Sequence, residues 1–108
     1  MGVDQKVINI QNESAREVMR TVEDIHNIKP YSILSPDKTW KVCDARHLCA
    51  YILHKVLGYR LVDTASIMMR DHSTIFKSCE KHQDLYGIDS AYRDKADIVM
   101  EVLQITDI

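Results

Sequence analysis

The chain has 108 residues, with 14 Lys and Arg against 16 Asp and Glu, which gives a net charge of −2. Hydrophobic residues make up 45% and charged residues 28%, a composition typical of one folded globular domain and not of a disordered chain. Only three Gly and two Pro argue against a turn-rich all-β fold, and the near-neutral charge argues against a uniformly basic nucleic-acid binder.

The sequence carries no visible signal for export or membrane insertion. No apolar run approaches the roughly 20 residues that a membrane span needs, and the N-terminus lacks the apolar segment of a signal peptide. Three cysteines, an odd number, favour free thiols in a reducing compartment. We therefore expect a cytoplasmic protein without a membrane partner.

Hydrophobic spacing predicts helices along nearly the whole chain. We interpret residues 1–13 as a polar N-terminal lead-in, whose order the sequence leaves open, before a single helical domain at 14–108. Ser14 and Glu17 form a capping box that should begin the first helix. That helix should end before Pro30, because the residue preceding a proline is pushed out of the helical region.

A short helical turn is predicted at residues 31–34, followed by a loop at 35–41. A long helix should then extend to about Leu57. Gly58 stands where a residue in the left-handed conformation commonly ends a helix.

Two helices joined by a tight turn predict a helix-turn-helix at about residues 61–86. The first covers 61–68, Met69 and Arg70 form the turn, and Asp71 is a good N-cap for the second.

The second helix of this unit should end at Gly87, and a last helix should run from Asp89 or Ser90 to about Gln104. The inward residues that we expect on these two helices are Ile75, Cys79, His82, Tyr86, Tyr92, Ala96, Val99 and Leu103. The predicted fold is therefore all-α, a compact helical domain of five or six helices.

The helix-turn-helix suggests a DNA-binding surface, because the N-terminal end of its second helix enters the major groove. Here the outward residues at that end are Asp71, His72 and Ser73, short polar groups that can reach base edges. Thr74 and the first-turn amides suit a phosphate oxygen, and Lys77 follows one turn later. From spacing alone, an ordinary helical hairpin in which Asp71 is only a cap remains an alternative.

The segment Arg70-Asp71-His72-Ser73-Thr74-Ile75 resembles the Arg-Asp-His-Thr-Thr-Val signature of the C-terminal DNA-binding domain of DnaA, the bacterial replication initiator. Similar segments over about residues 14–86 are Thr21-Val22-Glu23, Ile33-Leu34-Ser35, Arg46-His47-Leu48 and Cys79-Glu80-Lys81. The resemblance implies sequence-specific binding of double-stranded DNA, with a role in replication control or transcriptional regulation.

The resemblance also implies roles for individual residues. It places Asp71, His72 and Ser73 at bases in the major groove and Lys38 in the minor groove. The residues that we expect at phosphates are Thr74, Arg46, Lys55 (or its neighbour His54), Lys77 and Arg70.

The charge is distributed unevenly along the chain. Residues 38–82 carry 8 basic and 4 acidic side chains, a net +4, whereas residues 1–37 carry −2 and residues 83–108 carry −4. The net charge thus hides a basic middle segment, and it does not exclude a DNA-binding protein.

A second hypothesis is a protein-interaction module that kept the fold but lost strong DNA affinity, because Asp37 and Trp40 replace basic residues of the family's loop. For Trp40 we favour packing over the core, with stacking on a sugar or anchoring of a protein partner as alternatives. The acidic C-terminal helix is usually just a solvated face, but it could also contact a replication initiator or another protein.

We expect neither catalysis nor a bound cofactor. Asp71, His72 and Ser73 are residue types of a hydrolase triad, but sequence neighbours on a helix do not face one another. The Cys and His spacings match no zinc pattern, and Cys49 and Cys79 fit small core residues. No Gly-rich phosphate loop with Lys and Ser or Thr occurs, so we expect no bound nucleotide and a stand-alone binding domain.

Overall fold

The structure, a computed structural model, describes the backbone of residues 5–105 and the side chains of residues 13–105. All of its regular elements in that range are helical, as predicted. The α-helices are α1 (Gln5–Ile25), α2 (Trp40–Tyr51), α3 (Leu61–Met68), α4 (His72–Ile88) and α5 (Ser90–Val102). A 3₁₀ turn, η1 (Ser32–Leu34), precedes α2, and a π-helical turn, η2 (Ile52–Val56), follows it.

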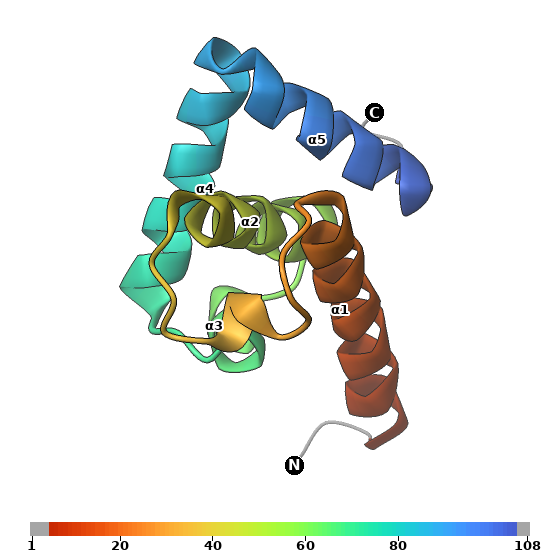
Figure 1. Cartoon of the computed structure of the whole chain (residues 1–108). Coiled ribbons are helices and arrows are strands. Elements are labelled where there is room, and N and C mark those ends of the chain that lie inside the picture. The colour runs from red at the N-terminus through yellow and green to blue at the C-terminus, as the bar shows by residue number, and fades with distance from the viewer. Residues whose placement is uncertain (1–4, 106–108) are drawn as a thin grey trace.

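Helix α2 is the central element of the fold. It packs against α4 on one side, α1 on another and η1 at its start, while α5 folds back to contact α4 and α1. Figure 1 shows α5 and α3 at opposite ends of the molecule, with α2 between them. The fully buried side chains that form the core include Ile33, Leu48, Ile52, Leu53, Met68, Ile75 and Val99.

The first helix begins earlier than the sequence predicts, at Gln5 and not at Ser14. No Gly or Pro lies between these two residues, so no local signal interrupts the helix there. Ser14 therefore lies inside the helix, where its side chain hydrogen-bonds to Tyr59 instead of capping backbone amides. Ser14 and Glu17 have the spacing of a capping box, but they do not begin a helix in the structure.

The end of α1 agrees with the prediction that the helix stops before Pro30. Asn27 takes the left-handed conformation, with φ of 56°. The Ile28 amide then donates to the Glu23 carbonyl at 3.1 Å, and the Asn27 amide donates to the Asp24 carbonyl at 3.1 Å. This pair of bonds is a Schellman motif, which satisfies carbonyls that the helix end leaves open.

The long second helix continues past α2 through η2, in which the Leu57 amide donates to the Ile52 carbonyl at 2.8 Å. Gly58 follows with φ of 77°, so its predicted left-handed conformation is confirmed. The π turn itself was not predicted, because the sequence indicates a regular helix up to about Leu57. Such turns are rare and frequently lie at functional sites.

Two partly or fully buried histidines sit between α2 and α4. His82 is buried as predicted; its Nδ1 lies 2.7 Å from the Tyr92 hydroxyl, and its ring stacks on Tyr51 at 3.9 Å. His47 lies 3.2 Å from the Ser78 hydroxyl. Burial lowers the pKa of each to about 4, helped for His47 by the Lys81 and Arg46 charges and for His82 by His47. Both are therefore neutral at neutral pH.

The predicted core stripes are mostly confirmed. On α4 the buried members are Ile75, Cys79 and His82, and on α5 they are Tyr92, Ala96 and Val99. Cys49 and Cys79 are buried free thiols, as expected of small core residues. Two predicted members differ. Tyr86 is 38% exposed, and its hydroxyl donates to Asp97 at 2.7 Å. Leu103 directly follows α5 and is only partly buried against the core.

Candidate nucleic-acid interface

The turn between α3 and α4 lies at Met69 and Arg70, as the sequence predicts. Met69 takes the left-handed conformation with φ of 56°, and the Arg70 amide donates to the Ala65 carbonyl at 2.9 Å. A left-handed backbone is uncommon for a residue other than Gly, and Met69 adopts it with a side chain that is 68% exposed. The chain thereby ends α3 and begins α4 within a few residues.

Asp71 caps α4 with its carboxylate. Its Oδ1 accepts from the Thr74 amide at 2.8 Å and from the Ser73 hydroxyl at 2.9 Å. These bonds, led by the Thr74 amide, hold the pKa of the Asp71 carboxyl below its usual range. The predicted cap is confirmed, and the carboxylate is ionised at neutral pH.

The first turns of α4 present four of the expected DNA-contacting residues to solvent. The side chains of His72, Ser73, Thr74 and Lys77 are all exposed. A shallow hollow lies between α3 and α4 beside them, lined by Val62, Ala65, Ser66, Arg70, Asp71, His72 and Ser73. The structure thus brings the outward end of α4 and the α3–α4 turn into one accessible surface.

Arg46 takes a different place from the one implied by the resemblance. It is only 9% exposed, and its guanidinium donates to the carbonyls of Ile33 at 2.9 Å and Ser32 at 3.2 Å. It also donates to the carbonyls of Asp37 and Ser35. Burial, together with the nearby Arg70 charge, lowers the pKa of this guanidinium. With its donors occupied by the loop, Arg46 is not presented to a phosphate in this arrangement.

Arg70 is also turned toward the loop that precedes α2. Its Nη2 donates to the Ser35 carbonyl at 2.7 Å and to the Ile33 carbonyl at 3.4 Å, while Nη1 donates to the Met69 carbonyl at 3.1 Å. Both Arg46 and Arg70 therefore donate to the carbonyls of Ile33 and Ser35. We call this pair of arginines the arginine clamp. The clamp ties the loop to both α2 and the helix-turn-helix.

Glu23 is a residue of this region that the sequence did not reveal. Its buried carboxylate accepts from the Ile33 amide at 3.1 Å, so that Ile33 is held by Glu23 at its N–H and by Arg46 at its carbonyl. Nothing in the helical spacing of Glu23 distinguishes it from a solvated acid, because its partner lies on another element. An acidic side chain thereby stabilises the loop from the opposite side.

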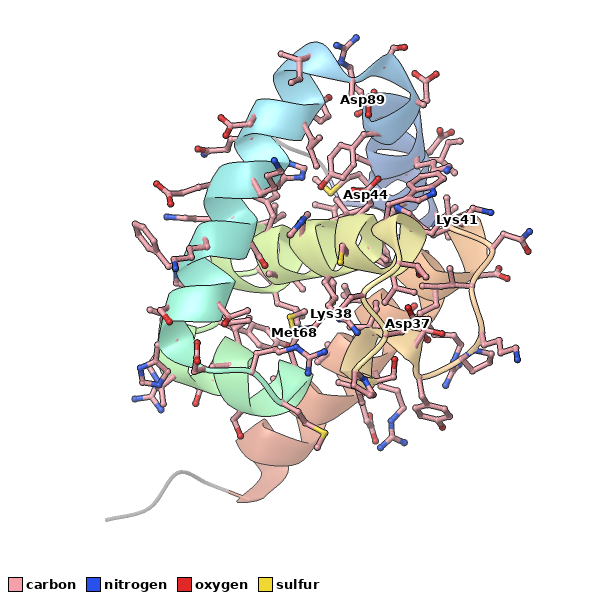
Figure 2. The ribbon with its side chains drawn as sticks, turned by 60° about the vertical axis from the view of Figure 1, so that its left-hand side comes forward. Asp37, Lys38, Lys41, Asp44, Met68 and Asp89 are labelled. Carbon is pink, nitrogen blue, oxygen red and sulfur yellow. The ribbon has the colours of Figure 1, made fainter. Side chains whose placement is uncertain are left out.

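Past the clamp, the loop exposes Lys38 beside Asp37 (Figure 2). The Asp37 carboxylate accepts from the Thr39 amide at 2.8 Å, which is the main reason that its pKa lies below the usual range. Asp37 thus stabilises the loop through the Thr39 amide, at a position where the family carries a basic residue. Lys38 therefore projects from a loop that is held by the arginine clamp and by Glu23.

The sequence left open whether His54 or Lys55 occupies the expected backbone-contacting position. His54 is engaged, because its Nδ1 lies 2.7 Å from the Tyr59 carbonyl. Lys55 is exposed on η2. Of the two residues, only Lys55 has the exposure that a phosphate contact requires.

Trp40 does not cover the core, and the favoured packing interpretation was wrong. Its side chain is 65% exposed at the start of α2. The ammonium groups of Lys41 and Lys95 lie 5.9 Å and 5.8 Å from the centre of its ring. The apolar side chains that are buried where η1 packs on α2 include Ile33 and Val42, and Trp40 is not among them.

Over the described residues, no group of three or more His, Cys, Asp or Glu side chains could hold a metal ion. Within the same part of the chain, no helix is long and apolar enough to cross a membrane.

Comparisons with known proteins agree with this geometry. The sequence model of the family described as "Bacterial dnaA protein helix-turn-helix" matches residues 15–81. Among solved structures, the crystal structure of a DNA replication initiation factor superposes with a TM-score of 0.79 at 16% identity, over 94% of this chain. The chain spans only 32% of that protein's length. A search of curated proteins finds no match.

Proposed function

The chain belongs to the bacterial DnaA helix-turn-helix family, and from this premise we propose that it binds double-stranded DNA at a specific sequence. The observation that carries the proposal is that the matched residues 15–81 include α3, the turn and the first part of α4, which begins with exposed polar side chains. Such a module has a role in replication control or transcriptional regulation, and it works as a binding protein and not as an enzyme.

The exposed start of α4 suggests how bases are read. His72 and Ser73 project from the first turn and can hydrogen-bond to base edges in the major groove. Asp71 keeps Oδ1 on the cap, so Oδ2 is the oxygen that would accept from a cytosine amino group. Recognition by Asp71 is therefore coupled to the geometry of the cap.

Contacts to the DNA backbone involve the exposed hydroxyl and lysine residues. Thr74 and Lys77 on α4 and Lys55 on η2 are exposed, which supports phosphate contacts by these residues, and the exposure of Lys38 on the loop supports a minor-groove contact. Arg46 and Arg70 then act through the loop: by fixing its carbonyls they hold Lys38 in position. Phosphate contacts set the register of a protein on the duplex, while base contacts specify the sequence.

A protein contact through the acidic C-terminal helix is the second candidate function. The side chains of Ile98 and Val102 on α5 are 45% and 57% exposed, and Ile88 at the end of α4 is 81% exposed. They stand in a segment, residues 83–108, that carries a net charge of −4. This mixture of apolar and acidic groups suits a partner protein such as a replication initiator.

The test of DNA binding is a fluorescence-anisotropy titration of two labelled duplexes, one with a DnaA-type box and one with the same bases scrambled, at two salt concentrations. We expect tighter binding to the box and a steep loss of affinity at higher salt, because each neutralised phosphate releases counterions. Binding to neither duplex at low salt would contradict the proposal. Equal binding to both would leave DNA binding without sequence specificity.

A pair of variants separates base reading from backbone binding. His72→Ala should lower affinity for the box more than for the scrambled duplex, because it removes a base contact. Lys77→Ala should weaken both duplexes alike and reduce the slope of log K against log salt by about 0.9, the value for one phosphate.

A further inference from the structure

Trp40 is the only tryptophan of the chain, and the structure leaves it on the surface. It is the first residue of α2 and directly follows the loop that carries Lys38. An indole with 65% of its surface in water gains little from packing, so this ring is available to another molecule.

Two lysines from different elements converge on this ring. Lys41 belongs to α2, whereas Lys95 belongs to α5 and lies outside the segment 15–81 that the family shares. Their ammonium groups lie 5.9 Å and 5.8 Å from the ring centre, within the range of a cation–π interaction. Figure 2 shows Lys41 where the start of α2 meets α5.

Neither ammonium is neutralised by a close carboxylate. Over the described part of the chain, the only ion pair within 4.0 Å is that of Arg60 and Asp63, on another part of the surface. Asp44 lies near Lys95 and Lys81 and interacts with them at longer range, but it is half-buried. Among the described residues, no carboxylate within 4.0 Å therefore competes with an anion for Lys41 or Lys95.

The position of Trp40 relative to Lys38 decides what can reach it. The two residues are separated by Thr39 alone, so their Cα atoms are at most about 7 Å apart. The phosphates of one DNA strand follow one another about every 3.4 Å along the helix axis. A duplex contacted by Lys38 therefore brings its next sugars and phosphates within reach of Trp40.

We propose that Trp40, Lys41 and Lys95, which we call the tryptophan patch, form a second contact with the sugar–phosphate backbone of duplex DNA. The indole lies against a deoxyribose, and the two ammonium groups bind the phosphates on either side of it. The patch replaces part of the positive charge that the loop lacks at Asp37 and Trp40, and it brings α5 into the interface. The inference rests on the proposed function and extends the bound surface beyond the helix-turn-helix.

Tryptophan fluorescence can be used to observe the patch directly, because Trp40 is the sole source of tryptophan emission. The protein is titrated with unlabelled box duplex while its tryptophan emission is recorded, and the anisotropy of a labelled duplex is measured in parallel. We expect the emission to change on binding and to saturate with the same Kd as the anisotropy.

Variants test each member of the patch by anisotropy. Lys95→Gln should weaken binding about two- to fivefold and reduce the salt slope by about 0.9. Trp40→Ala should weaken it by about fivefold or more, and Trp40→Phe by less, since a phenyl ring retains part of the stacking surface. Lys29→Gln, which removes the same charge from the exposed turn after α1, is the matched control and should change Kd less than about twofold. Circular dichroism confirms that each variant is folded.

The results distinguish failure of the patch from failure of the proposed function. If anisotropy shows binding while the emission stays constant and Lys95→Gln behaves like Lys29→Gln, the patch is overturned and DNA binding stands. If neither duplex binds at all, both the patch and the proposed DNA binding are overturned. Tighter emission-detected binding to single-stranded DNA than to duplex would also overturn the assignment, because the indole would then be stacking on bases.

Discussion

Arg46 shows how far the function of one side chain depends on what surrounds it. A buried guanidinium is costly unless its donors are satisfied, and this one donates to four carbonyls of the preceding loop. Its planar group offers five N–H donors in a fixed arrangement, which a lysine ammonium cannot reproduce. The residue that resembles a phosphate-binding arginine thus has a structural partner within its own chain.

We expect Arg46→Ala to lower the free energy of unfolding by about 2–3 kcal/mol, because it removes several charge-assisted hydrogen bonds from a buried site. Arg46→Lys should recover only part of this. Urea denaturation measures the change, and the DNA titration should show weaker binding because the loop that carries Lys38 is no longer held.

The control for this substitution is Arg60→Ala. Arg60 also contacts an oxygen acceptor, the Asp63 carboxylate at 2.8 Å, but the pair is exposed and should contribute little to stability. A loss of stability in Arg46→Ala no larger than in Arg60→Ala would show that the clamp does not hold the loop.

At the scale of the element, the helix-turn-helix is the part of the fold that the sequence predicted best. The bounds of α3, the position of the turn at Met69 and Arg70, and the cap at Asp71 all agree with expectation. Each of these features depends on residues within about four positions of one another, so sequence patterns contain them. The π turn η2 and the early start of α1 lacked such a signal.

The helix-capping role of Asp71 and its proposed contact with a base can be separated by substitution. Asn is as good an N-cap as Asp, so Asp71→Asn should leave the melting temperature close to that of the natural chain. It should nevertheless change the preferred base at one position of the DNA site, because an amide both donates and accepts. Thermal melting and titration against single-base variants of the box measure the two effects.

Asp71→Ala completes the comparison, because alanine neither caps nor contacts a base. It should lower both the melting temperature and the affinity. If Asp71→Asn and Asp71→Ala keep the same base preference as the natural chain, Asp71 is only a cap, which is the alternative that the spacing alone left open.

At the scale of the whole molecule, α5 completes the core although it lies beyond the segment matched by the family. Its buried residues Tyr92, Ala96 and Val99 pack with the core built by α1, α2 and α4. Helix α5, which carries Asp94, Asp97 and Glu101, also lies away from the start of α4, since α5 and α3 lie at opposite ends of the molecule (Figure 1). Its negative charge therefore does not oppose DNA at the helix-turn-helix.

A pair of identical substitutions on α5 tests this structural contribution. Val99 is fully buried and Val102 is 57% exposed. We expect Val99→Ala to lower the free energy of unfolding by about 2 kcal/mol, because it leaves a cavity in the core. Val102→Ala should change it by less than about 0.5 kcal/mol. Equal effects in urea denaturation would show that α5 is not part of the cooperative unit.

The sequence by itself determined the all-α class, the order of the helices, the helix-turn-helix and the exposed residues at its start. Caps, helix-ending residues and apolar spacing act within one or two helical turns, so they can be recognised in the sequence without a structure. Only the tertiary structure decided the places of Arg46, Arg70 and Trp40. Arg46 finds its carbonyl partner 13 positions away and Arg70 finds its partner 35 positions away. Such contacts exist only once the loop has folded back, and they decide whether a charged side chain or an indole is buried or exposed.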